Sequence, residues 1–429
     1  MNYTFRFLAL LLSGLVISPA AGAQEVRKMD GVTAIRAGAL LDVNSGEVMR
    51  DVVVIVREGR IASMGKDLSI PTGATVIDLS DKFVLPGLMD AHTHLLIQPD
   101  YASNNPILYK SIPFRTAEGI AAARATLMAG FTSVRDMDSE GADWADLAVR
   151  DAINQGLVMG PRAQVATRAL SITGGYMNQN GLAPQIDVPQ FGVLVDSDDA
   201  IVNEIRTEVK YGTDWIKLYA TGTTRHINLE DMTPLPQFSR EEIELVVKEA
   251  SRFRIPVAAH AYGGPGAYNA VNAGVRSIEH GMLLEDATLD LMVAKGTFWV
   301  PTISVYMSDG LPAEWSARTT AIVSAHKETF GRAIQKGVKI AYGTDAGAIP
   351  HGENAIDFAL MVDYGMTPLN AIRSATIVTA DLMGLTDETG SLTPGLAADI
   401  IAVDSNPLDD IEALKRVTFV MKDGHIYKQ

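Results

Sequence analysis

Short apolar runs alternate with amphipathic stretches through the middle of the chain. Eight runs rich in β-branched or aliphatic residues predict strands at 83–90, 131–136, 163–168, 215–220, 257–260, 277–280, 298–303 and 339–343. Alanine-rich stretches with helical periodicity lie between several of them, at 116–129, 198–211, 240–252 and 321–336. Strands that alternate with helices indicate βαβ units and a parallel sheet. Eight such units favour a closed (β/α)₈ barrel, with a doubly wound open sheet as the structural alternative.

The two ends of the chain have a different pattern. Strand-like segments separated by turns lie at 33–37, 52–57, 60–64 and 75–78, and again at 400–403, 418–422 and 425–427. We therefore predict an α/β protein in which a (β/α)₈ TIM barrel carries a small β-sandwich built from both termini. The expected domains are a signal peptide over 1–23, sandwich parts over 24–82 and 389–429, and a metallohydrolase barrel over 83–388.

The first residues indicate export. Arg6 precedes an apolar run over 7–17, and Ala21-Gly22-Ala23 provides small residues for cleavage after Ala23. The run is shorter than the roughly 20 residues of a spanning helix. We expect a periplasmic or secreted protein with no membrane attachment in its mature form.

Composition narrows the function classes. The chain contains no cysteine, so its stability must come from a large core rather than from disulfides, and 47% of its residues are hydrophobic. The formal charge of −15 argues against nucleic acids and anionic membranes as partners. A small-molecule substrate is the remaining expectation.

The candidate chemistry lies at the ends of predicted strands. His92 and His94 are two residues apart on the first predicted strand. Because successive side chains of a strand alternate between its faces, both histidines point the same way, about 7 Å apart. Further candidates end the fourth, fifth, sixth and eighth strands, and these are Lys217, His260, His280 and Asp345. Each alone could be a structural core or rim residue. Active sites of such barrels lie at the C-terminal strand ends, so together these residues predict one site.

This set of side chains suits divalent metal ions. Neutral imidazoles and carboxylates bind Zn²⁺ and similar cations. A lysine can bridge two metals only as a carbamate formed from its neutral amine and CO₂, and burial favours that neutral amine. Two cations about 3.5–4 Å apart lower the pKa of a bridging water to about 7 and polarise a carbonyl. Asp345 would orient this water, accept its proton and pass it to the leaving amine.

Four segments resemble signatures of the amidohydrolase superfamily, and they lie at 84–94, 277–281, 343–347 and 390–400. The chain most resembles its exported Xaa-Pro-dipeptidase-like, or carboxypeptidase-like, branch, which includes ochratoxin-degrading amidohydrolases. This resemblance implies that His92, His94 and Asp345 hold the more buried metal. It implies that His260 and His280 hold the other and that carboxylated Lys217 bridges the two. It also implies a homo-oligomer.

The expected function is binuclear, metal-dependent hydrolysis of an amide next to a C-terminal carboxylate. By resemblance the substrate is an N-acyl amino acid or a dipeptide, with cleavage of ochratoxin A to ochratoxin alpha and phenylalanine as one case. A mononuclear deaminase or a cyclic-amide hydrolase is the same-fold alternative. By the resemblance, mononuclear deaminases and imidazolonepropionase-like enzymes lack the lysine on strand four, whereas binuclear amide hydrolases use one. A non-catalytic exported binding protein is the alternative from another class.

Substrate contacts are expected beside the fourth strand. Tyr219 shares the face of Lys217, and Arg225 and His226 follow in the next loop, where a guanidinium suits a carboxylate. A solvated loop is the other interpretation of Arg225 and His226. The chain departs from its relatives at Tyr176, because a histidine often follows the Gly-Gly pair there.

Overall fold

The computed structural model describes residues 26, 29, 31–101, 105–179, 181–307 and 313–429. The signal peptide expected over 1–23 lies outside these residues. Within the described part of the chain, no helix combines the length and apolar character needed to cross a bilayer.

Eight parallel strands form the barrel. They are β5 (Leu88–Thr93), β6 (Phe131–Asp136), β7 (Arg162–Val165), β10 (Ile216–Tyr219), β11 (Val257–Gly263), β12 (Ser277–Leu283), β13 (Phe298–Val300) and β14 (Lys339–Ile340). Trp215 N donates to Val165 O at 3.2 Å, which joins β10 to β7. Ala91 N donates to Tyr342 O at 2.8 Å, which joins β5 to the segment after β14. These bonds connect the two barrel sheets, and the predicted fold class is confirmed. A short pair, β8 (Leu170–Ser171) and β9 (Val193–Leu194), extends the sheet beside β10.

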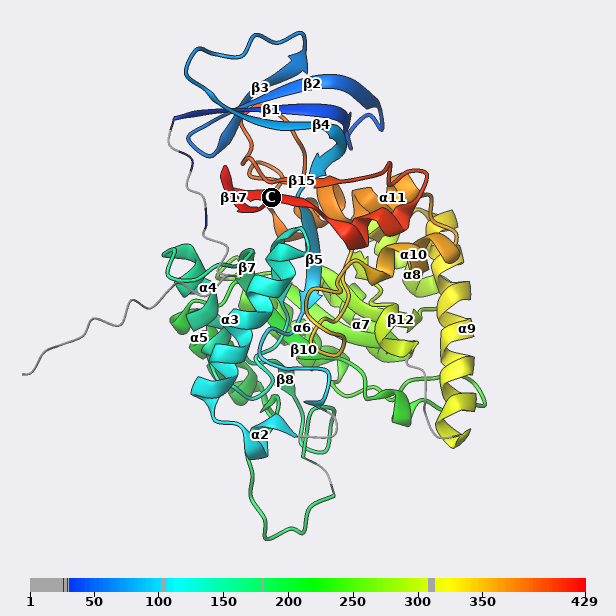
Figure 1. Ribbon diagram of the computed structural model, residues 1–429. Helices are drawn as coiled ribbons and strands as arrows, with labels where there is room; N and C mark the ends of the chain where they lie inside the picture. Colours follow the sequence, from blue (N-terminus) through cyan, green and yellow to red (C-terminus); the bar gives the residue numbers. More distant parts are fainter. Residues whose placement is uncertain (1–25, 27–28, 30, 102–104, 180, 308–312) are drawn as a thin grey trace, which may run out of the picture.

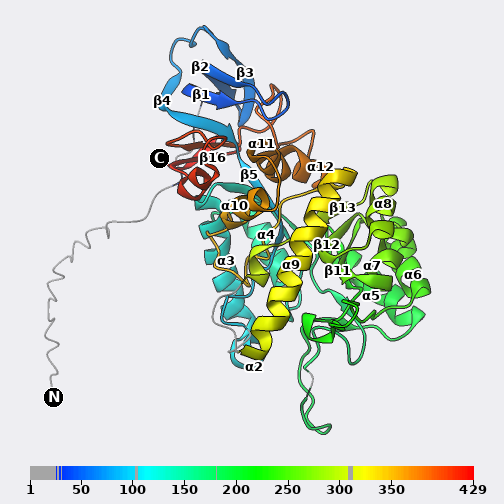
Figure 2. The same cartoon turned by 90° about the vertical axis from the view of Figure 1, so that its right-hand side faces the viewer.

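Helices follow most strands and cover the barrel (Figures 1 and 2). The principal ones are α3 (Ile112–Met128), α4 (Ala145–Asn154), α5 (Asp198–Tyr211), α6 (Arg240–Ser251), α7 (Gly264–Ala273), α8 (Asp286–Lys295) and α9 (Ala313–Lys336). Shorter ones are α2 (Pro106–Tyr109), α10 (Ile356–Asp363), α11 (Pro368–Arg373) and α12 (Thr379–Met383), with a π-helical turn η3 (Ser374–Val378) between the last two. The 3₁₀ turns are η1 (Thr224–His226), η2 (Ser304–Tyr306) and η4 (Ile411–Arg416). Ser239 and Glu242 form a capping box that fixes where α6 begins.

Strands from both termini share one seven-stranded sheet, in the order β17-β16-β15-β4-β1-β2-β3. Their bounds are β1 (Val32–Leu41), β2 (Val48–Arg57), β3 (Arg60–Lys66), β4 (Thr75–Pro86), β15 (Ile400–Val403), β16 (Phe419–Lys422) and β17 (His425–Lys428). Strand β4 is the seam, because it pairs with β1 on one side and with β15 on the other. The strand expected over 83–90 is divided: residues 83–86 end β4, and the barrel begins with β5.

Buried polar contacts hold this β domain against the end of the barrel where the strands begin (Figure 1). Gly87 N donates to Asp399 O at 2.9 Å, and Arg162 Nη1 donates to Asp399 Oδ2 at 2.8 Å. The joint therefore anchors the start of β5, while the other end of β5 presents its histidines.

A buried histidine on α9 has no role at the metal centre and makes stability depend on pH. His326 is fully buried beside the rings of Trp299 and Tyr364, and neither ring nitrogen has a hydrogen-bond partner among the described residues. Burial lowers the pKa of His326 to about 3. The free energy of unfolding therefore carries no penalty from His326 above about pH 6.5, the pKa of histidine in the unfolded chain. It decreases as the pH falls from there towards 3, the pKa of His326 in the folded chain.

We predict that His326→Phe removes part of the acid sensitivity of the fold. At pH 5 the unfolded chain binds a proton at His326 that the folded chain does not, which costs about 2 kcal/mol of stability. Urea unfolding at pH 7 and pH 5 should show a smaller loss for the variant by about that amount. Equal losses in both proteins would contradict this account of His326.

Candidate metal centre

The end of β5 places two histidines beside one carboxylate. His92 Nε2 lies 3.5 Å and His94 Nε2 lies 3.1 Å from Asp345 Oδ1. The three ligand atoms lie within 4.8 Å of one another, so a single cation could contact all of them. Asp345 follows β14, next to β5 in the barrel, and its N–H donates to His92 O at 2.8 Å. Closure of the barrel thus brings together residues that are 250 positions apart in the chain.

The remaining candidates, Lys217, His260 and His280, lie on β10, β11 and β12, which are consecutive strands of the barrel. The rings of His92 and His280 are 4.9 Å apart, and those of His280 and His260 are 4.5 Å apart, measured between centroids. Lys217 on β10 is 1% exposed. The structure therefore brings all six predicted ligands to one end of the barrel: His92, Lys217, His260 and His280 lie on β5, β10, β11 and β12, and His94 and Asp345 lie just after β5 and β14.

A chain of buried charges fixes the orientation of His92. Its Nδ1 lies 2.8 Å from Glu279 Oε2, and Arg135 Nη2 donates to Glu279 Oε1 at 2.8 Å. With Nδ1–H donated to this carboxylate, the Nε2 lone pair of His92 is free to bind a cation. That Nε2 atom and the Nε2 atom of His260 are buried without a hydrogen-bond partner in the described structure. The donor set therefore fits a divalent metal ion.

The other two imidazoles have their own partners. His280 Nδ1 lies 2.8 Å from the Thr302 hydroxyl. His94 Nδ1 lies 3.3 Å from Asp138 O and 3.5 Å from Glu140 Oε1. The histidines of β5 therefore face carboxylates on the side away from the centre, whereas His280 faces a neutral hydroxyl.

The environment makes most of these groups neutral donors. Burial, with the charge of Lys217, lowers the pKa of His92 to about 4, and burial also lowers the pKa of His260 and His280. Burial opposes the protonation of His94, yet its contact with Asp345 and the charge of Glu140 raise its pKa to about 10. Without a metal His94 therefore shares a proton with Asp345, and a bound cation would take the place of that proton.

Lys217 differs from an ordinary surface lysine. Burial lowers its pKa, although the carboxylates of Glu279 and Asp345 oppose the shift. Burial thus increases the fraction of neutral amine, which is the form that can combine with CO₂.

The backbone around the centre is strained and tightly packed. His280 and Asp345 have φ angles of 72° and 65°, in the left-handed region that residues other than glycine rarely adopt. Such conformations persist where the surrounding structure enforces them, often at functional sites. Gly343 approaches β5 so closely that a Cβ atom there would lie 2.3 Å from Val300 Cγ1 and 2.9 Å from His92 Cβ.

A cavity of about 410 Å³ opens beside the centre. Its lining includes His280 and Asp345 at the centre, Arg225 and Arg318, and four tyrosines, namely Tyr101, Tyr176, Tyr262 and Tyr306. Arg225 thus lies in the wall of the cavity that opens beside the centre. Tyr176, the residue that departs from the family pattern, also lines the cavity, with its ring 4.8 Å from that of His260.

The expected contact from Tyr219 has a different environment. Its hydroxyl donates to Asp138 Oδ2 at 2.6 Å, and the side chain is buried outside the cavity lining. Tyr219 is thus committed to a partner within the protein, and Tyr176 and Tyr262 present phenols to the cavity instead. The side chain of His226 lies outside what the structure describes.

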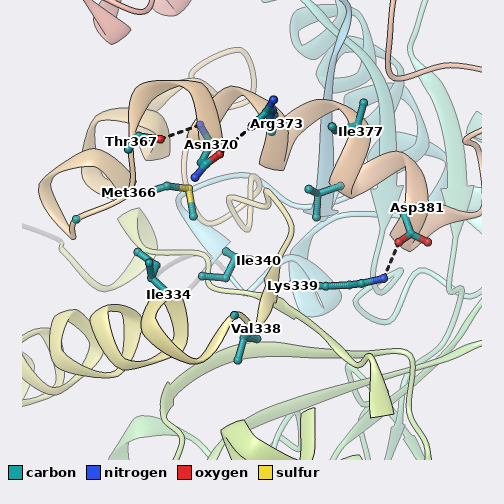
Figure 3. A pocket seen from close by; sticks show the side chains of 13 residues that line it. Ile334, Val338, Lys339, Ile340, Met366, Thr367, Asn370, Arg373, Ile377 and Asp381 are labelled. Carbon is teal, nitrogen blue, oxygen red and sulfur yellow. Dashed lines mark hydrogen bonds and ion pairs between the residues drawn. The ribbon is translucent and has the colours of Figure 1, made fainter. Parts of the chain in front are cut away.

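Figure 3 shows a different cavity, of about 440 Å³, near the start of β14. It lies between α9, α11 and α12, and none of the candidate ligands lines it. Its polar side chains are already paired: Lys339 Nζ donates to Asp381 Oδ2 at 2.8 Å, and Arg373 Nε donates to Val43 O at 2.7 Å. The contact of Arg373 with Val43 belongs to the joint between the barrel and the β domain, whereas that of Lys339 with Asp381 joins β14 to α12.

Candidate metal ligands at the C-terminal strand ends of a (β/α)₈ barrel, together with a terminal β domain, are typical of a class of hydrolases. The amidohydrolase family model matches residues 83–427, and the chain belongs to the amidohydrolase family. It is 31% identical to ochratoxinase of Aspergillus niger, over 92% of this chain and 87% of that protein. The crystal structure of A. niger ochratoxinase superposes with a TM-score of 0.80, at 30% identity over 93% of this chain and 96% of that one. A Xaa-Pro dipeptidase with bound methionine in its active site superposes with a TM-score of 0.84, at 35% identity over 93% of this chain and 100% of that one.

Sequence reasoning missed the groups behind the histidines. Arg135, Asp138 and Glu140 follow one another on and after β6, and all three are buried. Charged residues at and after the end of a predicted strand were the available signal. Their partners are distant in sequence, so the pattern alone could not identify what each one contacts.

We predict that Gly343→Ala weakens metal binding without unfolding the protein. The added methyl group would clash with Val300 Cγ1 and with His92 Cβ, and a shift of His92 should lower zinc affinity about tenfold or more. Competition with a chromophoric chelator measures the affinity, and circular dichroism checks the fold. Gly331→Ala on α9 is the matched control, because its Cβ would meet nothing within 4 Å and zinc binding should be unchanged. Wild-type affinity in Gly343→Ala would contradict the close approach.

Proposed function

We propose that the chain is a binuclear metal-dependent amide hydrolase that cleaves next to a free C-terminal carboxylate. The observation that carries the proposal is the buried Lys217 beside four imidazoles and Asp345, because a metal centre with a single cation has no use for a lysine there. Family membership and the resemblance to ochratoxinase and Xaa-Pro dipeptidase support the reaction class. N-acyl amino acids and dipeptides are the proposed substrates, with ochratoxin A among them.

The proposed ligand sets divide the centre in two. His92, His94 and Asp345 would hold one zinc ion, His260 and His280 the other, and a carbamate on Lys217 would bridge them. Two bound cations would supply an activated water and a polarised carbonyl. The free Nε2 atoms of His92 and His260 are consistent with this arrangement.

The protein's own residues would then manage protons and orientation. Asp345 lies at the boundary between ligand set and cavity, with its side chain 14% exposed, so its second oxygen can reach the attacking water. Contacts with His92 and His94 hold the pKa of Asp345 well below its usual range, even though burial raises it. Asp345 therefore begins as a base, accepts the proton of the water and delivers it to the departing amine.

The cavity suggests how the substrate is oriented. Arg225 offers a guanidinium for the terminal carboxylate, at the side of the cavity formed by the loop after β10. Tyr306, Val305 and Ile322 present an apolar surface to the side chain or acyl group. A substrate held at both ends would place its amide carbonyl near His280 and Asp345.

We also infer export from the N-terminal residues and self-association from the resemblance. Residues 1–23 would direct the chain to the periplasm or the medium, and the mature chain would form homo-oligomers. Peptide mass mapping of the mature N-terminus and light scattering of the purified protein test these two inferences.

Two zinc ions per chain and release of phenylalanine from N-acyl-phenylalanines, including ochratoxin A, are the expected results for the mature protein. Metal is counted by mass spectrometry after dialysis, and phenylalanine is measured by chromatography. One metal per chain and no release would instead favour the deaminase or cyclic-amide alternative, and Lys217 would then need another explanation.

Asp345→Asn should lower kcat by at least about 10²-fold, because an amide cannot accept the proton of the attacking water. An amide oxygen can still act as a ligand, so the variant should keep bound zinc. The measurement combines initial rates on an N-acyl-phenylalanine with metal counting on the same preparation. Full activity in this variant would remove Asp345 from the mechanism.

A further inference from the structure

We propose that Glu140 is a positioning residue for His94. The carboxylate of Glu140 would support metal binding at the His92–His94–Asp345 site. The inference rests on the proposed metal centre and concerns a residue outside the ligand set. Its basis is the geometry behind the two histidines of β5. Metal-binding histidines commonly donate their second N–H to a carboxylate or carbonyl, which fixes the tautomer and strengthens the ligand.

His92 provides the reference within the same strand. Its Nδ1 contacts the carboxylate of Glu279 at 2.8 Å, and Arg135 and Ser277 hold that carboxylate in place. Glu140 Oε1 lies 3.5 Å from Nδ1 of His94, which is a longer contact than that between Glu279 and His92, and the nearer partner of this Nδ1 atom is Asp138 O at 3.3 Å. The two residues proposed to hold one metal thus each have a buried carboxylate beside Nδ1.

The loop that presents Glu140 is rigidly held. Arg115, 1% exposed, donates through Nη2 to Ser139 O at 3.1 Å and to Glu140 O at 2.8 Å. Its Nε donates to Leu96 O at 3.1 Å, in the loop just after His94. One guanidinium therefore ties the segment of Glu140 to the segment of His94, so the two side chains keep their relative position.

The structure gives Glu140 no other evident use. Its side chain is buried, Oε2 has no hydrogen-bond partner in the described part of the chain, and its φ of 52° lies in the left-handed region. A buried carboxylate and a strained backbone each cost free energy, and a protein keeps them where another interaction compensates. Contact with a histidine that binds a cation on its far nitrogen would provide that compensation, because the side chain of Glu140 would then hold the ring of His94 in place.

The competing account is that the Asp138 carbonyl alone orients His94, from 3.3 Å. A backbone carbonyl fixes the tautomer as well as a carboxylate does, but it lacks the negative charge. The two accounts differ in one respect: only the first makes metal affinity depend on the charge of residue 140.

The test compares zinc affinities of the full-length mature protein with those of Glu140→Gln, Glu140→Asp and Glu279→Gln. Titration against a chromophoric chelator resolves the two zinc equivalents, and circular dichroism of the metal-free proteins confirms folding. Glu140→Gln should weaken one equivalent by about 10- to 100-fold, the range found when such outer partners are removed. Glu279→Gln should weaken the same equivalent. Glu140→Asp keeps the charge and should bind more tightly than Glu140→Gln.

Thr302→Val is the matched control, because Thr302 contacts His280 of the other proposed site. It should leave the equivalent affected by Glu140→Gln unchanged. Wild-type zinc affinity in Glu140→Gln, or equal weakening in the Asp and Gln variants, would overturn the role of Glu140. Failure of the wild-type protein itself to bind two zinc ions would overturn the proposed function, so the two failures are distinguishable.

Discussion

The end of the barrel that carries the candidate metal centre depends on the pairing of buried charges. Arg135 and Glu279 form an ion pair with no exposed surface, and removal of either partner would leave an isolated charge in the interior. The pair tolerates burial because further groups use its remaining donors and acceptors: Arg135 Nε donates to Ala91 O at 2.6 Å, and Glu279 accepts from His92. The same contacts hold β5, β6 and β12 in the register that brings their ends together.

The rest of the molecule keeps that arrangement fixed. The β domain holds the start of β5 through Asp399, and Gly343 lets the chain after β14 lie directly against His92. The backbone is strained at His280 and Asp345, where positive φ angles accompany side chains that point towards the centre. The cavity beside the centre is lined mainly by loops and by tyrosines, so substrate preference can change there without disturbing the metal ligands.

The two histidines of β5 show how one strand serves both fold and chemistry. Alternation sends His92 and His94 towards Asp345, while the residues around them pack into the barrel. Their outer nitrogens face Glu279 and Glu140, which come from two different neighbouring elements. The environment of the two histidines therefore depends on β12, the loop after β6 and the segment after β14 as well as on the His-x-His motif.

Periodicity and strand-end positions were sufficient to predict the barrel, the terminal β strands and the gathering of the six candidate residues at one end of the barrel, because these depend on local pattern and on the common direction of parallel strands. The division of residues 83–90 between two sheets was not predictable, since the apolar pattern runs through Gly87 and it is pairing with β1 and β15 that assigns residues 83–86 to the terminal sheet. The partner of Tyr219, the carboxylates behind the histidines and the place of Tyr176 in the cavity were decided by tertiary structure. Each of these depends on contacts between residues far apart in the chain, which no local pattern records.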